Sequence, residues 1–122
     1  MRRFFIIFFA SFCLFSYAKQ EQIVLTPNGP IHDREGQPIY FDIPLAYYDD
    51  NPKNPEIIID GGGAVSYYDV EITSAATNAV EISTQVNGIY DTFSVSSLTP
   101  GTHVITIESA SGNTYEGTFT TN

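Results

Sequence analysis

The chain has 122 residues with a single cysteine, and its five Lys or Arg residues and 14 Asp or Glu residues give a formal net charge of −9 at pH 7. A chain this acidic repels phosphate backbones and anionic lipids, which argues against nucleic acid and membrane surfaces as partners. If the partners of the protein are charged, we expect them to be cationic.

The first residues have the pattern of a secretory signal peptide. Two arginines precede an apolar run over residues 4–15, and Ser16 and Ala18 supply the small residues of a cleavage site. The run is shorter than the roughly 20 residues that a membrane-spanning helix needs. We therefore expect residues 1–18 to be removed, and the protein to be exported through the Sec-type route to the periplasm, the cell surface or the outside of the cell.

Two alternatives for this leader are an uncleaved anchor and a lipid anchor on Cys13. Lipoprotein cleavage needs a small residue before the cysteine, whereas Phe12 is bulky. Cleavage after Ala18 instead leaves a mature chain of about 104 residues without cysteine or an integral membrane segment, in which three basic residues face 14 acids, a net charge of −11. No disulfide can form in it, and its length suits one domain with its own core.

The start of the mature chain, residues 19–38, contains one short apolar burst followed by turn-forming residues, so we expect an edge strand and a loop there. The next segment reads IYFDIPLAYYDD over residues 39–50. Because proline donates no backbone hydrogen bond, Pro44 predicts either an edge strand that changes sheets or a strand broken at this point. Residues 56–60, EIIID, form a β-branched run that is typical of a strand buried on both sides.

The rest of the chain alternates apolar and polar residues, as half-buried strands do. Residues 66–73 predict one such strand, with Tyr68 inward and Asp69 and Glu71 outward, and residues 102–109 predict another, with His103, Ile105 and Ile107 on one face. In the next strand we expect Val80 and Ile82 to face inward, and Glu81 to face outward. The step from Asn87 to Gly88 suits a tight turn with positive φ.

About seven short strands separated by turns, and no helical periodicity after the leader, predict an all-β immunoglobulin-like sandwich of antiparallel strands. The paired cysteines and the tryptophan of antibody domains are absent. The expected organisation is a helical signal peptide at residues 1–18, an edge strand and loop at 19–38, and the sandwich domain at 39–122.

The closing stretch, LTPGTHVITIESASGNTYEGTFTT, resembles small secreted proteins of Bacteroidetes-type bacteria, a domain-of-unknown-function family with an immunoglobulin-like fold. The resemblance extends over residues 39–120 and implies one sandwich domain behind a signal peptide. His103 stands where the family usually has tyrosine, so we expect a core-facing ring with one nitrogen hydrogen-bonded; a functional histidine is the alternative. The same stretch also resembles C-terminal sorting domains, but these follow a larger cargo and usually end in a lysine-rich strand.

Catalytic groups are sparse. The mature chain has two histidines, His32 and His103, no cysteine and no G-x-S-x-G motif. Nucleophilic catalysis needs a nucleophile, a base and an orienting acid within hydrogen-bond reach. We therefore predict that the protein is not an enzyme and has no cofactor.

Two weak candidate sites remain. Calcium prefers hard oxygen ligands, which Asp49, Asp50 and Asp60 could supply around the sheet ends, although no EF-hand spacing is present. Tyrosines enriched at interfaces could form a platform for a protein or a glycan. The candidates for that platform are Tyr47, Tyr48 and Tyr67, provided that the outward-facing ones share a sheet.

The sequence thus predicts non-covalent recognition at the cell envelope or outside the cell, by a sandwich that serves as a frame for loops and strand faces. The competing class is a structural or assembly subunit, in which the Pro44 strand or the N-terminal segment adds to the sheet edge of a neighbour.

Overall fold

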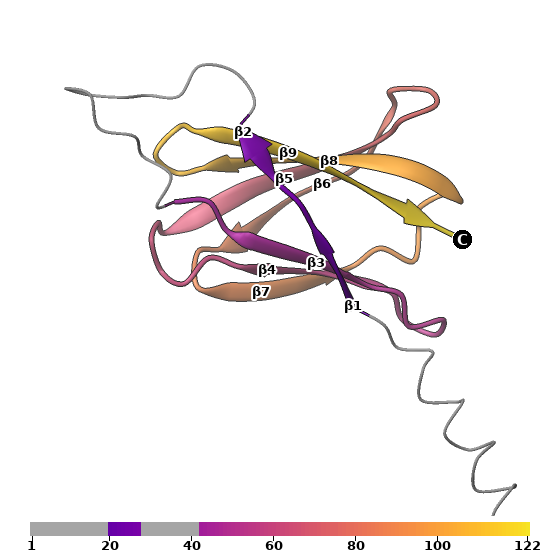
Figure 1. Cartoon of the computed structure of the whole chain (residues 1–122), viewed down its shortest axis with the longest axis horizontal. Coiled ribbons are helices and arrows are strands. Elements are labelled where there is room, and N and C mark those ends of the chain that lie inside the picture. Colours follow the sequence, from indigo (N-terminus) through magenta and orange to yellow (C-terminus); the bar gives the residue numbers. More distant parts are fainter. Residues whose placement is uncertain (1–19, 28–41) are drawn as a thin grey trace, which may run out of the picture.

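A computed structural model describes residues 20–27 and 42–122, which form two antiparallel β-sheets packed face to face (Figure 1). The signal peptide, Cys13 and His32 lie outside the described residues. The four-stranded sheet has the order β1-β3-β4-β7, and the five-stranded sheet has the order β2-β9-β8-β5-β6. The strands are β1 (Gln20–Ile23), β2 (Thr26–Pro27), β3 (Leu45–Asp49), β4 (Glu56–Asp60), β5 (Tyr67–Ser74), β6 (Val80–Asn87), β7 (Tyr90–Ser94), β8 (Gly101–Ser109) and β9 (Thr114–Thr121).

The core lies between the sheets and follows the predicted alternation. Tyr68, Val70 and Ile72 of β5 point inward and are at most 1% exposed, and the inward residues of β8 pack beside them. In β4 the two inward isoleucines are buried, and Ile58 on the outer face is also only 5% exposed. The sandwich and the doubly buried β4 that the sequence predicts are thus confirmed, and residues 20–27, within the segment where one edge strand is expected, form two short edge strands, β1 and β2.

The N-terminal strand changes sheets. β1 pairs with β3 in one sheet, and two residues later β2 pairs with β9 in the other. The crossing passes over Gly117, where a Cβ would lie 2.7 Å from both the Ile23 side chain and the Val24 carbonyl oxygen. A larger residue at this position of β9 would therefore displace the N-terminal strand.

The prediction of an edge strand around Pro44 is wrong, whereas its alternative, a strand broken at Pro44, stays a prediction because residues 39–41 lie outside the described residues. β3 begins at Leu45, directly after the proline, and lies inside its sheet between β1 and β4. Because Pro44 precedes the ladder, its missing N–H removes no strand hydrogen bond. β3 therefore has no free edge to offer to a neighbour.

A β-bulge reverses the expected facing at the start of β6. Ile72 pairs with Ile82 and Thr73 pairs with Val80, so Glu81 is the extra residue. Val80 is consequently 55% exposed, whereas the Glu81 carboxylate reaches inward to His103. Because side chains in a strand alternate between the two faces, one extra residue switches the face of every residue before it. The alternating pattern alone cannot predict the position of such a bulge.

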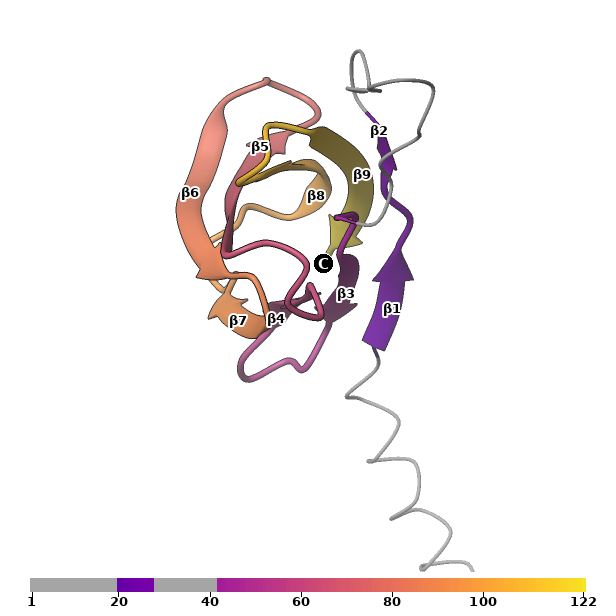
Figure 2. The same cartoon turned by 90° about the vertical axis from the view of Figure 1, so that its left-hand side faces the viewer.

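The Asn87–Gly88 step is not a hairpin turn. It carries the chain from β6 in one sheet to β7 in the other, and neither residue has positive φ. Glycine is needed at position 88 because its backbone lies close to the backbone of the segment from Gly63 to Ser66. The Gly88 amide donates to the Ser66 carbonyl at 3.0 Å, and the Gly88 carbonyl accepts from the Gly63 amide at 2.9 Å. The end-on view shows β6 and β7 on one side of the sandwich and the β1–β2 segment on the other (Figure 2).

Candidate functional site

The outer face of the five-stranded sheet carries a row of carboxylates. β5 turns Asp69 and Glu71 outward, because the residues on either side of each face the core. The neighbouring strands add Glu108 from β8 and Glu116 from β9 on the same face. Alternation therefore gathers acids that are distant in sequence onto one surface, which we call the acidic face.

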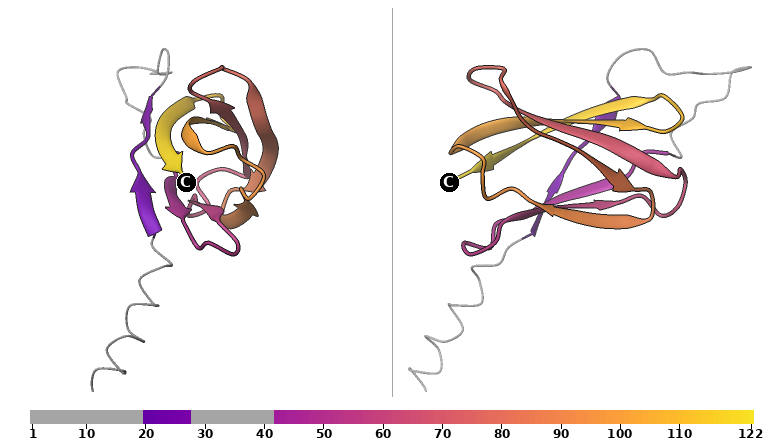
Figure 3. Two further views of the ribbon diagram at one scale, coloured as in Figure 1. Left: turned by 90° about the vertical axis from the view of Figure 1, so that its right-hand side faces the viewer. Right: turned by 180° about the vertical axis from the view of Figure 1, so that it is seen from behind.

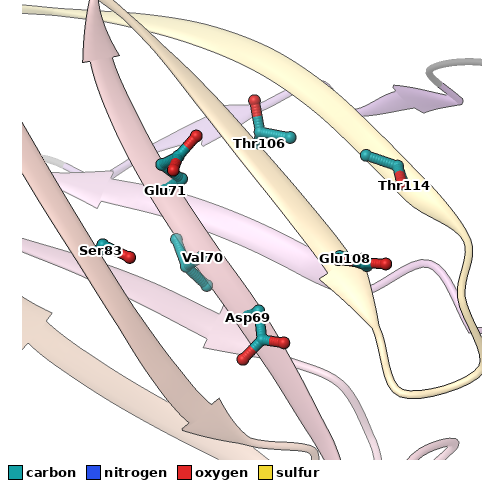
Figure 4. Close-up of a pocket in the computed structure, with 7 residues that line it drawn as sticks. All are labelled: Asp69, Val70, Glu71, Ser83, Thr106, Glu108 and Thr114. Atoms are coloured by element: carbon teal, nitrogen blue, oxygen red, sulfur yellow. The ribbon is translucent and has the colours of Figure 1, made fainter. Parts of the chain in front are cut away.

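A shallow hollow of about 170 Å³ lies at the centre of the acidic face (Figure 4). Three carboxylates and three hydroxyls, drawn from four strands, line it. The lining residues are Asp69, Val70, Glu71, Ser83, Thr106, Glu108 and Thr114.

Like charges meet at this hollow. Asp69 of β5 lies directly opposite Glu108 of β8, an arrangement that destabilises a sheet by a few tenths to about 1 kcal/mol. Gln85 donates a hydrogen bond of 3.0 Å to Asp69 Oδ1, which satisfies one oxygen without neutralising the charge. Within residues 20–27 and 42–122 the sequence contains one Lys or Arg, Lys53, and it follows β3 of the other sheet.

The structure does not gather the three predicted tyrosines on one face. Tyr47 points outward from the four-stranded sheet and is half-buried, whereas Tyr48 points into the core and is 6% exposed. Tyr67 points outward from the five-stranded sheet. The common platform is absent because Tyr47 and Tyr67 belong to different sheets.

The three predicted calcium ligands do not form one site either. Asp49 pairs with Glu56, and Asp60 pairs with Leu45, so Asp49 and Asp60 lie four residues apart along the strands, about 13 Å. Two ligands of one calcium ion can be at most about 5 Å apart. Among the described residues no group of three His, Cys, Asp or Glu side chains could hold a metal ion.

The structure does bring together Tyr48 and Asp50, which the sequence assigned to two different sites. Both line a second hollow of about 290 Å³ at the end of the sandwich where the chain terminates. Burial and the negative charges of Asp50, Glu21 and Asp49 raise the pKa of Tyr48, so its hydroxyl stays protonated. The lining residues are Tyr48, Asp50, Asn51, Pro52, Pro55 and Asn122.

His103 faces the core as the sequence predicts. It is fully buried and stacks on Phe119, with ring centroids 5.6 Å apart. Its Nε2 lies 3.4 Å from Glu81 Oε1, and neither ring nitrogen makes a hydrogen bond among the described residues, so the expected bond is replaced by this longer contact. Burial raises the pKa of Glu81, but the hydrogen bonds from the Thr99 hydroxyl and amide and the electrostatic influence of the adjacent His103 outweigh it and lower the pKa below its ordinary value.

Asp42 is the centre of a buried polar network that the sequence analysis missed. The residue is fully buried, and four side chains of the β8–β9 hairpin donate hydrogen bonds to its carboxylate. Ser109, Ser111 and Asn113 reach Oδ2 at 2.8, 2.5 and 3.0 Å, and the Tyr115 hydroxyl reaches Oδ1. The network fastens the segment before β3 to the hairpin of the opposite sheet.

Tyr68 completes this network by donating a hydrogen bond of 3.0 Å to the Asp42 carbonyl oxygen. Burial and the negative charge of Asp42 raise the pKa of Tyr68 to about 12. Burial and the hydrogen bond to Asp42 also raise the pKa of Tyr115. Both hydroxyls therefore remain donors at any physiological pH.

A signal for this network was present in the sequence. Asp42 is a single acid in the apolar run IYFDIP, and a buried carboxylate requires donors. The stretch SASGNTY, which follows β8 residue Glu108, is rich in such donors. Pairing the two segments across 67 or more residues, however, needs the tertiary structure.

The network predicts a specific loss of stability in acid. Burial raises the pKa of Asp42, but the four hydrogen bonds outweigh it and hold the pKa below its ordinary value. The stabilising contribution is therefore full above the unfolded pKa of about 3.9 and is lost as the pH falls through the lower folded value. Urea unfolding from pH 7 to pH 2 should show a steeper loss below about pH 4 for the wild type than for Asp42→Asn. Parallel curves would contradict this assignment.

The sequence matches no protein-family profile and no curated protein at a significant level. Among solved structures, the chain is similar to a DUF3244 family protein with an immunoglobulin-like β-sandwich fold from Bacteroides vulgatus ATCC 8482, with a TM-score of 0.64 and 13% sequence identity. The match covers 85% of this chain and 100% of that one. It confirms the immunoglobulin-like fold and the resemblance to a Bacteroidetes-type domain of unknown function. The described residues contain no helix long and apolar enough to cross a membrane.

Proposed function

We propose that the protein is a non-catalytic recognition domain that works at the cell envelope or outside the cell, and that its acidic face binds a cationic region of a partner protein. The observation that carries the proposal is the pair of Asp69 and Glu108, placed opposite each other at the hollow in a sheet whose described strands contain no Lys or Arg. A sequence optimised for stability alone avoids like charges at directly opposed positions. Local conflicts of this kind are expected at functional sites.

The dimensions of the hollow favour a protein partner over a small molecule. Pockets for small molecules are usually about 300–1,000 Å³, whereas this hollow has about 170 Å³ and opens on a flat sheet face. A single Lys or Arg side chain suits such a space, because carboxylates accept charge-assisted hydrogen bonds and the hydroxyls can accept the remaining donors. Glu71 and Glu116 would attract further cations around this anchor.

We expect Glu108→Gln to weaken binding to a cationic probe and to raise the stability of the domain slightly. The substitution removes the like-charge repulsion and one of the three carboxylates at the hollow. Titration of the ¹⁵N-labelled protein with poly-L-lysine should shift amide signals of β5, β8 and β9 in the wild type, with at least a threefold loss of affinity in the variant. Added salt should weaken the binding, since exposed charges are screened.

Glu56→Gln is the matched control. Glu56 also lies opposite an acid, Asp49, but on the four-stranded sheet, so the change in net charge and the type of pair are the same. The proposal requires that only Glu108→Gln weakens binding. If both variants weaken binding equally, or if the shifted signals are spread over both sheets, the chain attracts cations by net charge alone and the acidic face is not a recognition site.

A further inference from the structure

We propose that two copies of this chain form a symmetric dimer by pairing their β6 edges in antiparallel orientation over residues 82–86. The resulting sheet would run continuously through both copies. This inference is independent of the cationic partner, because it concerns an edge of the five-stranded sheet and not its outer face.

The other sheet edges carry features that oppose pairing. β1 has four residues with an acid among them, and β2 has two residues, one of which is Pro27. β7 has five residues and places Asp91 on its inward side, opposite the buried Ile59. Short edge strands, proline and inward-pointing charges are the usual protections against edge-to-edge association.

β6 is different. It has eight residues and is the outermost strand of its sheet, and in the end-on views it forms the outer side of that sheet, with β7 of the other sheet below its end (Figure 2 and Figure 3, left). Its bulge at Glu81 disturbs only one end. The remaining segment ISTQV, residues 82–86, contains no charge, no proline and no glycine. A regular edge of this composition can accept another strand.

The segment is complementary to itself. Ile82, Thr84 and Val86 face the core side of the sheet, and Ser83 and Gln85 face the solvent side. A two-fold axis at Thr84 places Ile82 opposite Val86 of the second copy, and Thr84 opposite its own counterpart. Ser83 then meets Gln85 of the second copy, so each cross-strand pair joins side chains of the same character and the same side, which stabilises sheets.

Exposed apolar residues flank the segment at both ends. Val80 at the start of β6 is 55% exposed, and Ile89, just after its end, is 67% exposed. Antiparallel pairing brings the start of one β6 beside the end of the other. Val80 of each copy would therefore lie close to Ile89 of the second copy. The dimer would thus contain two such pairs, and these apolar side chains would contact each other instead of solvent.

Charge does not prevent this association at physiological salt. On β6 itself, Glu81 turns inward to His103, and Asp91, just beyond the end of the strand, accepts a hydrogen bond from the Asn87 amide. The acids that β5 exposes beside the interface, Asp69 and Glu71, are separated from those of the second copy by three strand spacings, about 14 Å. The Debye length is about 8 Å at physiological ionic strength and about 30 Å at 0.01 M. The dimer should therefore dissociate more readily at low salt than at physiological salt.

Sedimentation equilibrium across concentration and salt tests the dimer. We expect the wild type to dimerise at physiological ionic strength, and Ser83→Lys combined with Gln85→Lys to weaken dimerisation at least tenfold, because lysines would face each other twice. Thr118→Lys combined with Thr120→Lys is the control, since it adds the same charge at exposed positions of β9. A wild type that stays monomeric up to about 1 mM, or a dimer that the first variant leaves unchanged, would overturn the proposal.

A cysteine at the symmetry axis gives a second readout. Directly opposed Cβ atoms in antiparallel strands are about 4.5–5.5 Å apart, near the range that a disulfide spans. In a Cys13→Ser background, Thr84→Cys should form a disulfide-linked dimer under mild oxidation, and Thr118→Cys should not. Equal cross-linking of the two variants would show random collision and would also contradict the pairing.

Discussion

Asp42→Ala is expected to lower the free energy of unfolding by at least about 3 kcal/mol. The substitution removes the acceptor of four side-chain hydrogen bonds, and three of the donor residues, Ser109, Asn113 and Tyr115, are buried. A buried donor left without a partner costs about 1–3 kcal/mol, and a small domain has a total stability of only about 5–15 kcal/mol. Urea unfolding followed by tyrosine fluorescence measures the change.

Asp49→Ala is the control for this prediction. Asp49 is also an acid close to the start of the sandwich, but it is half-buried and accepts one hydrogen bond, from the Asn51 amide at 3.2 Å. Its replacement should cost less than about 1 kcal/mol. If the two variants lose similar stability, the Asp42 network contributes no more than an ordinary surface turn.

The second large effect is expected for Gly88→Ala, with a loss of about 3 kcal/mol or more. A Cβ at this position would lie 1.8 Å from the Val65 carbonyl oxygen and 2.7 Å from its carbonyl carbon. The backbone cannot move away freely, because Gly88 exchanges hydrogen bonds with Ser66 and Gly63. Forcing extra volume into a packed site typically costs about 1–3 kcal/mol, and here the obstacle is backbone.

Gly62→Ala separates this steric effect from a general effect of replacing glycine. Gly62 lies in the facing loop at φ +65°, with no atom within 4 Å of a Cβ. Alanine there should cost only about 1–2 kcal/mol, from the left-handed conformation. Thermal unfolding of both variants ranks them, and a larger loss for Gly62→Ala would contradict the role of close approach at the β6–β7 corner.

The two proposals concern adjacent parts of the same sheet. β6 borders β5, so pairing of β6 edges would place the acidic faces of two copies on one side of a continuous sheet. A partner with two cationic regions could then engage both faces, and its second contact would be intramolecular. The variant with both Ser83→Lys and Gln85→Lys should be monomeric. Compared with the wild type, it should therefore lose more affinity for a long poly-L-lysine than for a short one.

Individual residues show how far sequence reasoning reached. The alternation in β5 and β8 correctly predicted the inward residues, including Tyr68 and His103, because side-chain facing in a strand is a local property. The same reasoning failed at Val80, where a bulge reverses the facing, and at Pro44, where β3 proved to be an interior strand. The sequence correctly places Asp69 and Glu71 of the candidate site on a solvent face. It does not predict that Asp69 lies directly opposite Glu108, because that pairing depends on which strands are neighbours.

The sequence by itself determined the class of the protein: an all-β sandwich, the segments that form its strands, and the overall acidity that favours cationic partners. These follow from composition, period and turn residues, which act over a few neighbouring positions. Only the tertiary structure decided which strands pair, and with them the acidic hollow, the buried Asp42 network, the separation of Tyr47 from Tyr67 and the exposed β6 edge. Those features join residues distant in the chain, and their partners are chosen by packing of the whole core.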